Sequence, residues 1–187
     1  MPYVVAALVL VGVLALLNLV LTFGVIRRLR AQADLLSASG VTGGAPIIPI
    51  GTPVGSFSAV STDGVEVTTA ALTGETVVGF FSPNCGPCEE ALPSFEEYAR
   101  RAPDGRRQIV AVVVPPPGEG TDGTDTGALA ARLESVATVV VQDGDGPVPK
   151  AFGVDGYPTL TVVDDGAVTA SGTTAASLPA LRAVARR

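Results

Sequence analysis

The chain has 187 residues, two cysteines, no histidine and a net charge of −6 at pH 7. This length suits one domain with an appendage, and an acidic chain without a basic stripe argues against nucleic acid as a partner. The lack of histidine excludes a Ser-His-Asp triad, a Cys-His protease site and an imidazole metal site, and two cysteines cannot form a structural zinc site within one chain. We therefore expect chemistry that two thiols perform without a metal or a cofactor.

Residues 3–26 are almost entirely apolar and contain no charged side chain. As a helix, this run would be about 36 Å long, which is enough to cross a hydrocarbon core of roughly 30 Å. It predicts a single transmembrane helix that anchors the chain in a membrane. A cleaved signal peptide is the alternative, but its apolar core would be shorter and would follow a basic start, which residues 1–3 do not provide.

A basic cluster and a stretch rich in glycine and proline follow this apolar run. Arg27, Arg28 and Arg30 come directly after it, and by the positive-inside rule they would place the rest of the chain in the cytoplasm. Residues 40–55 contain five glycines and three prolines, a composition typical of a linker. The predicted organisation is an anchor with a juxtamembrane helix over residues 1–39, a linker over residues 40–55 and a folded domain over residues 56–187.

The predicted domain alternates between strand and helix patterns. Two apolar runs, residues 76–81 and 108–114, are typical of strands buried on both faces. Further strand patterns lie at residues 56–60, 65–69, 138–141, 159–163 and 168–170. Helical patterns lie at residues 88–101, 128–136 and 178–187, and residues 115–127 form a predicted loop. This alternation predicts an α/β fold in which helices flank a mixed central β-sheet.

Cys85 and Cys88 form a Cys-Gly-Pro-Cys sequence between a predicted strand and a predicted helix. Disulfide exchange requires a thiolate that attacks and a second thiol that resolves the mixed disulfide. A sulfur at a helix N-terminus meets unpaired N–H groups and the positive end of the helix dipole, which lower the pKa of a thiol. We therefore predict that Cys85 is the nucleophile and Cys88 the resolving thiol. The alternatives are a structural disulfide, whose small loop would stabilise the fold little, and half of a zinc site shared between two chains.

Two segments of the chain resemble the signature segments of thioredoxin-like proteins. Residues 80–93, with the sequence FFSPNCGPCEEALP, resemble the active-site segment, and Pro93 matches the proline that kinks the helix of that family. Residues 151–160, with the sequence AFGVDGYPTL, resemble the segment that contains the family's cis-proline, here Pro158. The resemblance covers about residues 51–187 and implies a thioredoxin-like fold.

The same resemblance implies which residues bind the substrate. It places Pro158 opposite the cysteines and exposes the backbone of Tyr157 for pairing with a substrate strand. Gly86 and Pro87 lie between the cysteines, complete the predicted substrate-binding set and resemble the residues found in reducing members of the family.

Three positions depart from the pattern of the family. Asn84 stands where the family usually has tryptophan, and Gly79 stands where cytosolic thioredoxin has a buried acid. Glu89 stands where thioredoxin often has lysine, and its charge should oppose thiolate formation nearby. We therefore expect a site tuned differently from that of thioredoxin.

The predicted anchor and the hairpin before the active-site strand make the chain similar to the tethered TlpA/ResA-like branch. The anchor, the basic cluster and the FFSP sequence also resemble the MauD-like proteins of methylamine-dehydrogenase maturation. The resemblance implies a membrane-tethered thiol–disulfide oxidoreductase that reduces protein disulfides with electrons from an unidentified donor protein. It also favours the extracytoplasmic face, in conflict with the positive-inside rule.

Two other functions remain open. A redoxin- or peroxiredoxin-like thiol peroxidase shares this fold, but its active-site pattern is half present, because Ser82 fits while Val78 stands at the proline position. The second is a non-catalytic module that uses the thioredoxin surface to hold a partner at the membrane.

Overall fold

The computed structural model describes residue 12, residues 48–116 and residues 118–183. The described fold belongs to the unit Thr42–Arg187. No helix within the described part of the chain is long and apolar enough to cross a membrane. The predicted span at residues 3–26, apart from residue 12, lies outside the described residues.

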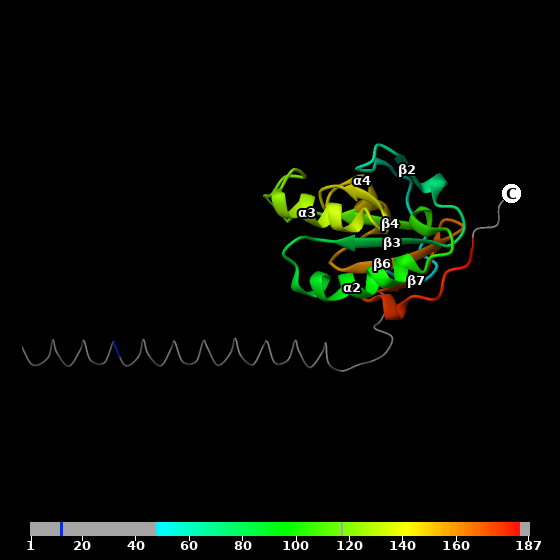
Figure 1. Ribbon diagram of the computed structural model, residues 1–187. Coiled ribbons are helices and arrows are strands. Elements are labelled where there is room, and N and C mark those ends of the chain that lie inside the picture. Colours follow the sequence, from blue (N-terminus) through cyan, green and yellow to red (C-terminus); the bar gives the residue numbers. More distant parts are fainter. Residues whose placement is uncertain (1–11, 13–47, 117, 184–187) are drawn as a thin grey trace, which may run out of the picture. The chain divides into compact units, whose positions relative to one another are not determined.

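The domain is built on a five-stranded sheet with the strand order β5-β4-β3-β6-β7. Its strands are β3 (Thr76–Phe81), β4 (Ile109–Val113), β5 (Thr138–Val141), β6 (Thr159–Asp164) and β7 (Ala167–Gly172). The central strand β3 pairs in parallel with β4 and antiparallel with β6, so the sheet is mixed, as predicted (Figure 1). All six residues of β3 are buried, which agrees with its continuous apolar sequence.

Helices and a hairpin cover the two faces of the sheet. Helices α2 (Gly86–Arg100) and α3 (Thr124–Leu133) pack with one face in a core that includes Leu92, Phe95 and Leu133. Helix α4 (Pro147–Phe152) shares the other core with the two-stranded hairpin of β1 (Ser58–Val60) and β2 (Glu66–Thr68). Short 3-10 helices are η1 (Thr69–Ala71), η2 (Gly105–Gln108) and η3 (Ala175–Ser177). The predicted α/β fold is confirmed.

The structure differs from two of the predicted helices. Helix α3 begins at Thr124, within the predicted loop, and ends at Leu133. The predicted closing helix at residues 178–187 is wrong in its described part, because residues 178–183 contain no helix. Leu178 has an extended backbone with a ψ of 143°, and it precedes Pro179, which disfavours the helical conformation in the residue before it.

Helix α4 was not predicted from the sequence. It has six residues, two of which are prolines, so its apolar pattern is too short to be recognised. Val148 and Phe152 are buried, and the Phe152 ring packs against Phe80 with the ring centroids 5.3 Å apart. Gly153 ends the helix with a φ of 64°, a conformation that glycine adopts without a side-chain clash.

The described end of the predicted linker is residues 48–55, of which residues 48–54 lie along the edge strand β7. Ile48 is 3% exposed, and its N–H donates to the Ser171 hydroxyl at 3.1 Å. Pro53 forms an antiparallel bridge with Ala167. These contacts join the segment to the core on the α4 side of the sheet.

Polar contacts hold the C-terminal segment near the residues that precede β3 and β4. The Glu75 carboxylate, 12% exposed, accepts hydrogen bonds from the backbone N–H of Arg182 at 2.6 Å and from its Nε at 2.7 Å. The buried Gln108 amide donates to the Arg182 carbonyl at 2.7 Å. The Tyr98 hydroxyl donates to the Pro179 carbonyl at 2.7 Å, and burial, with a smaller effect of the Glu75 charge, raises the pKa of Tyr98 to about 12.

Candidate functional site

The two cysteines lie where β3 ends and α2 begins. Cys85 is the N-cap residue of α2, and its sulfur accepts a hydrogen bond from the backbone N–H of Cys88 at 3.3 Å. Pro87 occupies the first turn, where its missing N–H removes no helical hydrogen bond. The sequence therefore starts the helix directly at the pair of sulfurs.

The structure holds Cys85 and Cys88 as a disulfide with their Cα atoms 5.2 Å apart. The two sulfurs differ in access, because Cys85 is partly exposed whereas Cys88 is 1% exposed within the core that α2 shares with the sheet. Gly86 and Pro87, between them, are exposed. This arrangement lets a partner reach Cys85 while Cys88 stays shielded.

Tyr157 and Pro158 lie beside the disulfide, although they are far from it in the sequence. The peptide bond between them is cis. The Cys85 sulfur lies 3.7 Å from the carbonyl oxygen of Tyr157. Burial raises the pKa of the phenol of the half-buried Tyr157 above its ordinary value. The structure thus brings together the cysteines and the two residues predicted to face them, while their roles in catalysis and substrate binding stay predictions.

The space around Gly79, in the middle of β3, is filled by aromatic rings. A Cβ atom at this position would lie 2.8 Å from the Phe81 ring and 3.1 Å from the Phe95 ring. These two rings pack edge to face with their centroids 4.9 Å apart. Because the rings occupy the space, a buried acid at position 79 would not fit, which explains this departure from thioredoxin.

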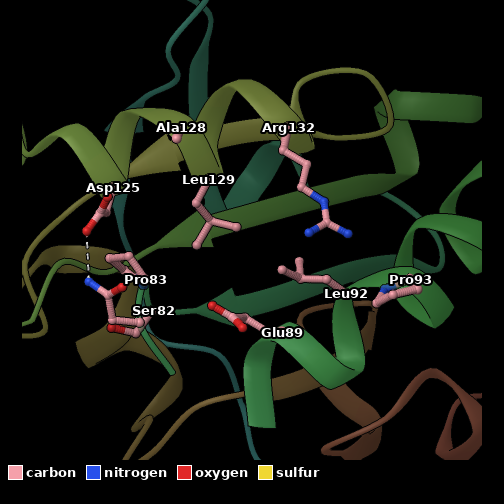
Figure 2. A pocket seen from close by; sticks show the side chains of 10 residues that line it. Ser82, Pro83, Glu89, Leu92, Pro93, Asp125, Ala128, Leu129 and Arg132 are labelled. Atoms are coloured by element: carbon pink, nitrogen blue, oxygen red, sulfur yellow. Dashed lines mark hydrogen bonds between the residues drawn. The ribbon is translucent and has the colours of Figure 1, made fainter. Parts of the chain in front are cut away.

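Asn84 fixes the loop between β3 and the disulfide. Its φ of 58° lies in the left-handed region, which asparagine tolerates better than most residues. Its side-chain amide donates to the Asp125 carboxylate at 3.0 Å, which ties this loop to the first turn of α3 (Figure 2).

A groove of about 510 Å³ opens between this loop, α2 and α3. Figure 2 shows Glu89 and Leu92 of α2 facing Leu129 and Arg132 of α3 across it. The complete lining is Ser82, Pro83, Asn84, Glu89, Leu92, Pro93, Asp125, Ala128, Leu129 and Arg132. The residues contributed by α3 were not identified from the sequence, although positions 125, 129 and 132 are spaced along one helix face.

The remaining observations bear on the alternatives for this site. The described residues include no group of three potential metal ligands. Val78, at the position where a peroxidatic pattern has proline, is 1% exposed and pairs with both neighbouring strands. A proline there would remove a hydrogen bond from the centre of a sheet.

Comparisons with known proteins agree with this geometry. The family model described as Redoxin matches residues 49–184. No curated protein sequence matches the chain. Among solved structures, a thio-disulfide isomerase from Thermus thermophilus is 23% identical with a TM-score of 0.51, over 68% of this chain and 87% of that chain. A thiol:disulfide interchange protein from Bacteroides sp. is 16% identical with a TM-score of 0.51, over 67% of this chain and 82% of that chain. These likenesses show a thioredoxin-like fold.

Proposed function

The chain belongs to the Redoxin family and has a thioredoxin-like fold, and from this premise we propose that it is an oxidoreductase that reduces protein disulfides through Cys85 and Cys88. The observation that supports this best is the difference between the two sulfurs. One is partly exposed at a helix N-terminus beside the Tyr157 carbonyl, and the other is buried one turn further along the helix.

The proposed reaction begins with the reduced pair. The Cys85 thiolate attacks one sulfur of a client disulfide, so a Cys85–client bond forms, the client bond breaks and the second client sulfur leaves as a thiolate that takes up a proton. Cys88 then loses its proton and attacks the Cys85 sulfur, so a Cys85–Cys88 bond forms, the Cys85–client bond breaks and the first client sulfur leaves as a thiolate that takes up a proton. The products are a client with two thiols and the Cys85–Cys88 disulfide present in the structure.

The electron balance requires a donor. Each cycle transfers two electrons from the cysteine pair to the client, so a second dithiol must reduce the Cys85–Cys88 disulfide before the next cycle. We assign this step to an unidentified donor protein. Gly86 and Pro87, which resemble the residues between the cysteines of reducing family members, support the reductive direction.

We also propose that residues 3–26 tether this activity to a membrane, with the domain on the extracytoplasmic face. The apolar run supports the tether, and the resemblance to tethered family members supports the side, although Arg27 and its neighbours favour the opposite orientation. Labelling Cys85 in intact cells with a membrane-impermeant thiol reagent, after dithiothreitol has opened the Cys85–Cys88 disulfide, tests the side. Labelling only after the cells are lysed would refute the extracytoplasmic placement.

Reduction of insulin disulfides in the presence of dithiothreitol tests the activity. We expect the wild-type chain to accelerate it and Cys85→Ser to leave only the rate of dithiothreitol alone, because no nucleophile remains. Ser58→Ala, at an exposed hydroxyl in β1, is the control and should retain the wild-type rate. Consumption of hydrogen peroxide with Cys85 trapped as a sulfenic acid, without insulin reduction, would instead indicate a peroxidase. Full function in cells of a chain lacking both thiols would indicate a binding module.

A further inference from the structure

The groove between α2 and α3 begins at the residue that precedes the reactive cysteine. Asn84 lines the groove, and the next residue is Cys85. In the sheet, β3 lies between β4 and β6. Pro158 precedes β6 on one side of Cys85, whereas α3 connects β4 to β5 on the other side. A polypeptide bound at Cys85 can therefore contact the Tyr157 backbone on one side and this groove on the other.

The groove has apolar walls, and it is acidic near the loop that precedes Cys85. Leu92 and Leu129 face each other across it (Figure 2). The rim near the loop contains the carboxylates of Glu89 and Asp125. Among the described residues, the Glu89 carboxylate has no hydrogen-bond or ion-pair partner, so it is available to a ligand.

The cation of the groove, Arg132, is already paired. Its Nε lies 2.5 Å from the Glu96 carboxylate, which also forms an ion pair with Arg100 at 3.1 Å. Arg132 therefore contributes little positive potential to a ligand, and the net charge of the lining is negative. A ligand of complementary charge is a cation with an apolar part.

We propose that this groove binds the client polypeptide on one side of its target cysteine and selects clients with a basic side chain next to that cysteine and an apolar side chain beyond it. The lysine or arginine would pair with Glu89 and Asp125, and the apolar side chain would cover Leu92 and Leu129. This inference names the substrate class of the reductase proposed above and rests on that function.

The test compares disulfides that differ only beside the cysteine. The substrates are short peptides with one cysteine joined to 2-mercaptoethanol, with the sequence Cys-Lys-Leu or Cys-Glu-Leu for one side of the cysteine and Leu-Lys-Cys or Leu-Glu-Cys for the other. The second-order rate constant for reduction by the reduced full-length chain is divided by that for bis(2-hydroxyethyl) disulfide, which is too small to reach the groove. We expect the lysine peptide to react about fivefold faster than the glutamate peptide at low salt, on one side of the cysteine only, and less so at high salt.

Variants at two adjacent positions of α2 show whether the groove causes this preference. Glu89→Lys should reverse it, because the unpaired carboxylate becomes a cation. Glu90→Lys is the matched control, since it makes the same change of charge at an exposed residue on the same turn that does not line the groove, and it should keep the preference. Equal rates for the two peptides, or a preference that Glu89→Lys leaves unchanged, would refute the proposal.

A second measurement separates the two proposals. Reduction of bis(2-hydroxyethyl) disulfide shows whether the chain is a disulfide reductase, whatever the groove binds. Binding of peptides with serine in place of cysteine, followed by fluorescence anisotropy, shows what the groove binds, whatever the redox activity. Tighter binding of the lysine peptide, lost in Glu89→Lys, would support the groove even without reduction, and equal binding of both peptides would refute it even if reduction occurs.

Discussion

At position 79 the central strand has no side chain, and the rings of Phe81 and Phe95 fill the space that one would need. Cytosolic thioredoxin has an acid at the matching position, so in the proposed reaction the proton of Cys88 would have to leave without that acid. Gly79 thus makes room for two packed aromatic rings where thioredoxin has a titratable side chain. Glycine at this position is favoured by packing, because an added Cβ would lie 2.8 Å from the Phe81 ring.

Gly79→Ala tests this packing. A methyl group 2.8 Å from the Phe81 ring forces the ring to move, and we expect a loss of about 1–3 kcal/mol in the free energy of unfolding of the oxidised protein. Urea denaturation followed by circular dichroism measures it. Gly127→Ala is the matched control, because Gly127 is exposed in α3 and no atom lies near an added Cβ. This alanine should instead raise the free energy of unfolding by about 0.5–1 kcal/mol, because alanine favours the helix more than glycine does. An unchanged stability in Gly79→Ala would show that the rings have room to move.

At the scale of elements, the Glu75 carboxylate makes two of the hydrogen bonds that attach the C-terminal segment to the sheet. Hydrogen bonds from Arg182 hold the pKa of Glu75 below its ordinary value of 4.5, against the opposing effect of burial. A carboxyl with a lowered pKa in the folded state stabilises the fold above its unfolded pKa, and this contribution is lost as the pH falls through the folded value. The attachment should therefore be strong at neutral pH and weaken in acid.

Glu75→Gln tests this attachment. We expect it to lower the free energy of unfolding by about 1 kcal/mol at pH 7, and the difference from wild type should shrink as the pH falls below about 4.5 and the wild-type carboxyl becomes protonated. Urea denaturation at several pH values measures the difference. Glu97→Gln, at an exposed ion pair with Arg101, is the control and should cost no more than about 0.5 kcal/mol. A difference for Glu75→Gln that stays constant down to pH 2.5 would contradict the linkage.

The elements also show where sequence patterns suffice. The strands were predicted close to their bounds because their apolar runs are continuous, as in residues 76–81. Helix α4 was missed because two prolines and six residues give no periodic pattern. The closing helix was wrong in its described part, residues 178–183, where Pro179 disfavours the helical conformation of Leu178. Neither error affects the sheet.

The candidate site was predictable in part for a physical reason. Cys85 and Cys88 are three residues apart, and Pro158 lies in residues 151–160, which resemble a segment of the family. Short sequence patterns therefore locate these residues. Asp125 and Arg132 enter the site only because α3 packs beside α2, and this packing depends on contacts between residues about forty positions apart, such as that of Asn84 with Asp125. No local pattern contains that information.

At the scale of the whole molecule, the described domain extends further toward the N-terminus than residue 56. Ile48 is buried, the backbone N–H of Gly51 donates to the Val168 carbonyl at 2.7 Å, and that of Val54 donates to the Gly166 carbonyl at 2.9 Å. The apolar contact and these hydrogen bonds stabilise the edge of the sheet at β7. Residues 48–54 thus contribute to the stability of the domain, whatever their role as a connection to the preceding segment.

Shortened chains test this contribution. A chain that begins at Thr42 keeps all the contacts of residues 48–54. A chain that begins at Ser56 should have a free energy of unfolding about 3 kcal/mol lower, because it lacks the buried Ile48 side chain and the hydrogen bonds of this segment. Urea denaturation measures both. Within the longer chain, Ile48→Ala should cost about 2 kcal/mol or more, whereas Ile50→Ala, at a side chain that is 66% exposed, should cost less than about 0.5 kcal/mol. Equal stability of the two shortened chains would show that this segment adds nothing.

The unequal access of the two sulfurs has a practical consequence. A chain with Cys88→Ser could still bond covalently to a client through Cys85, but no second sulfur would remain to release it. Each molecule of such a chain would hold one client through a disulfide with Cys85, and a reductant added later would release that client. Mass spectrometry of the proteins eluted in this way would identify the natural clients directly from cells.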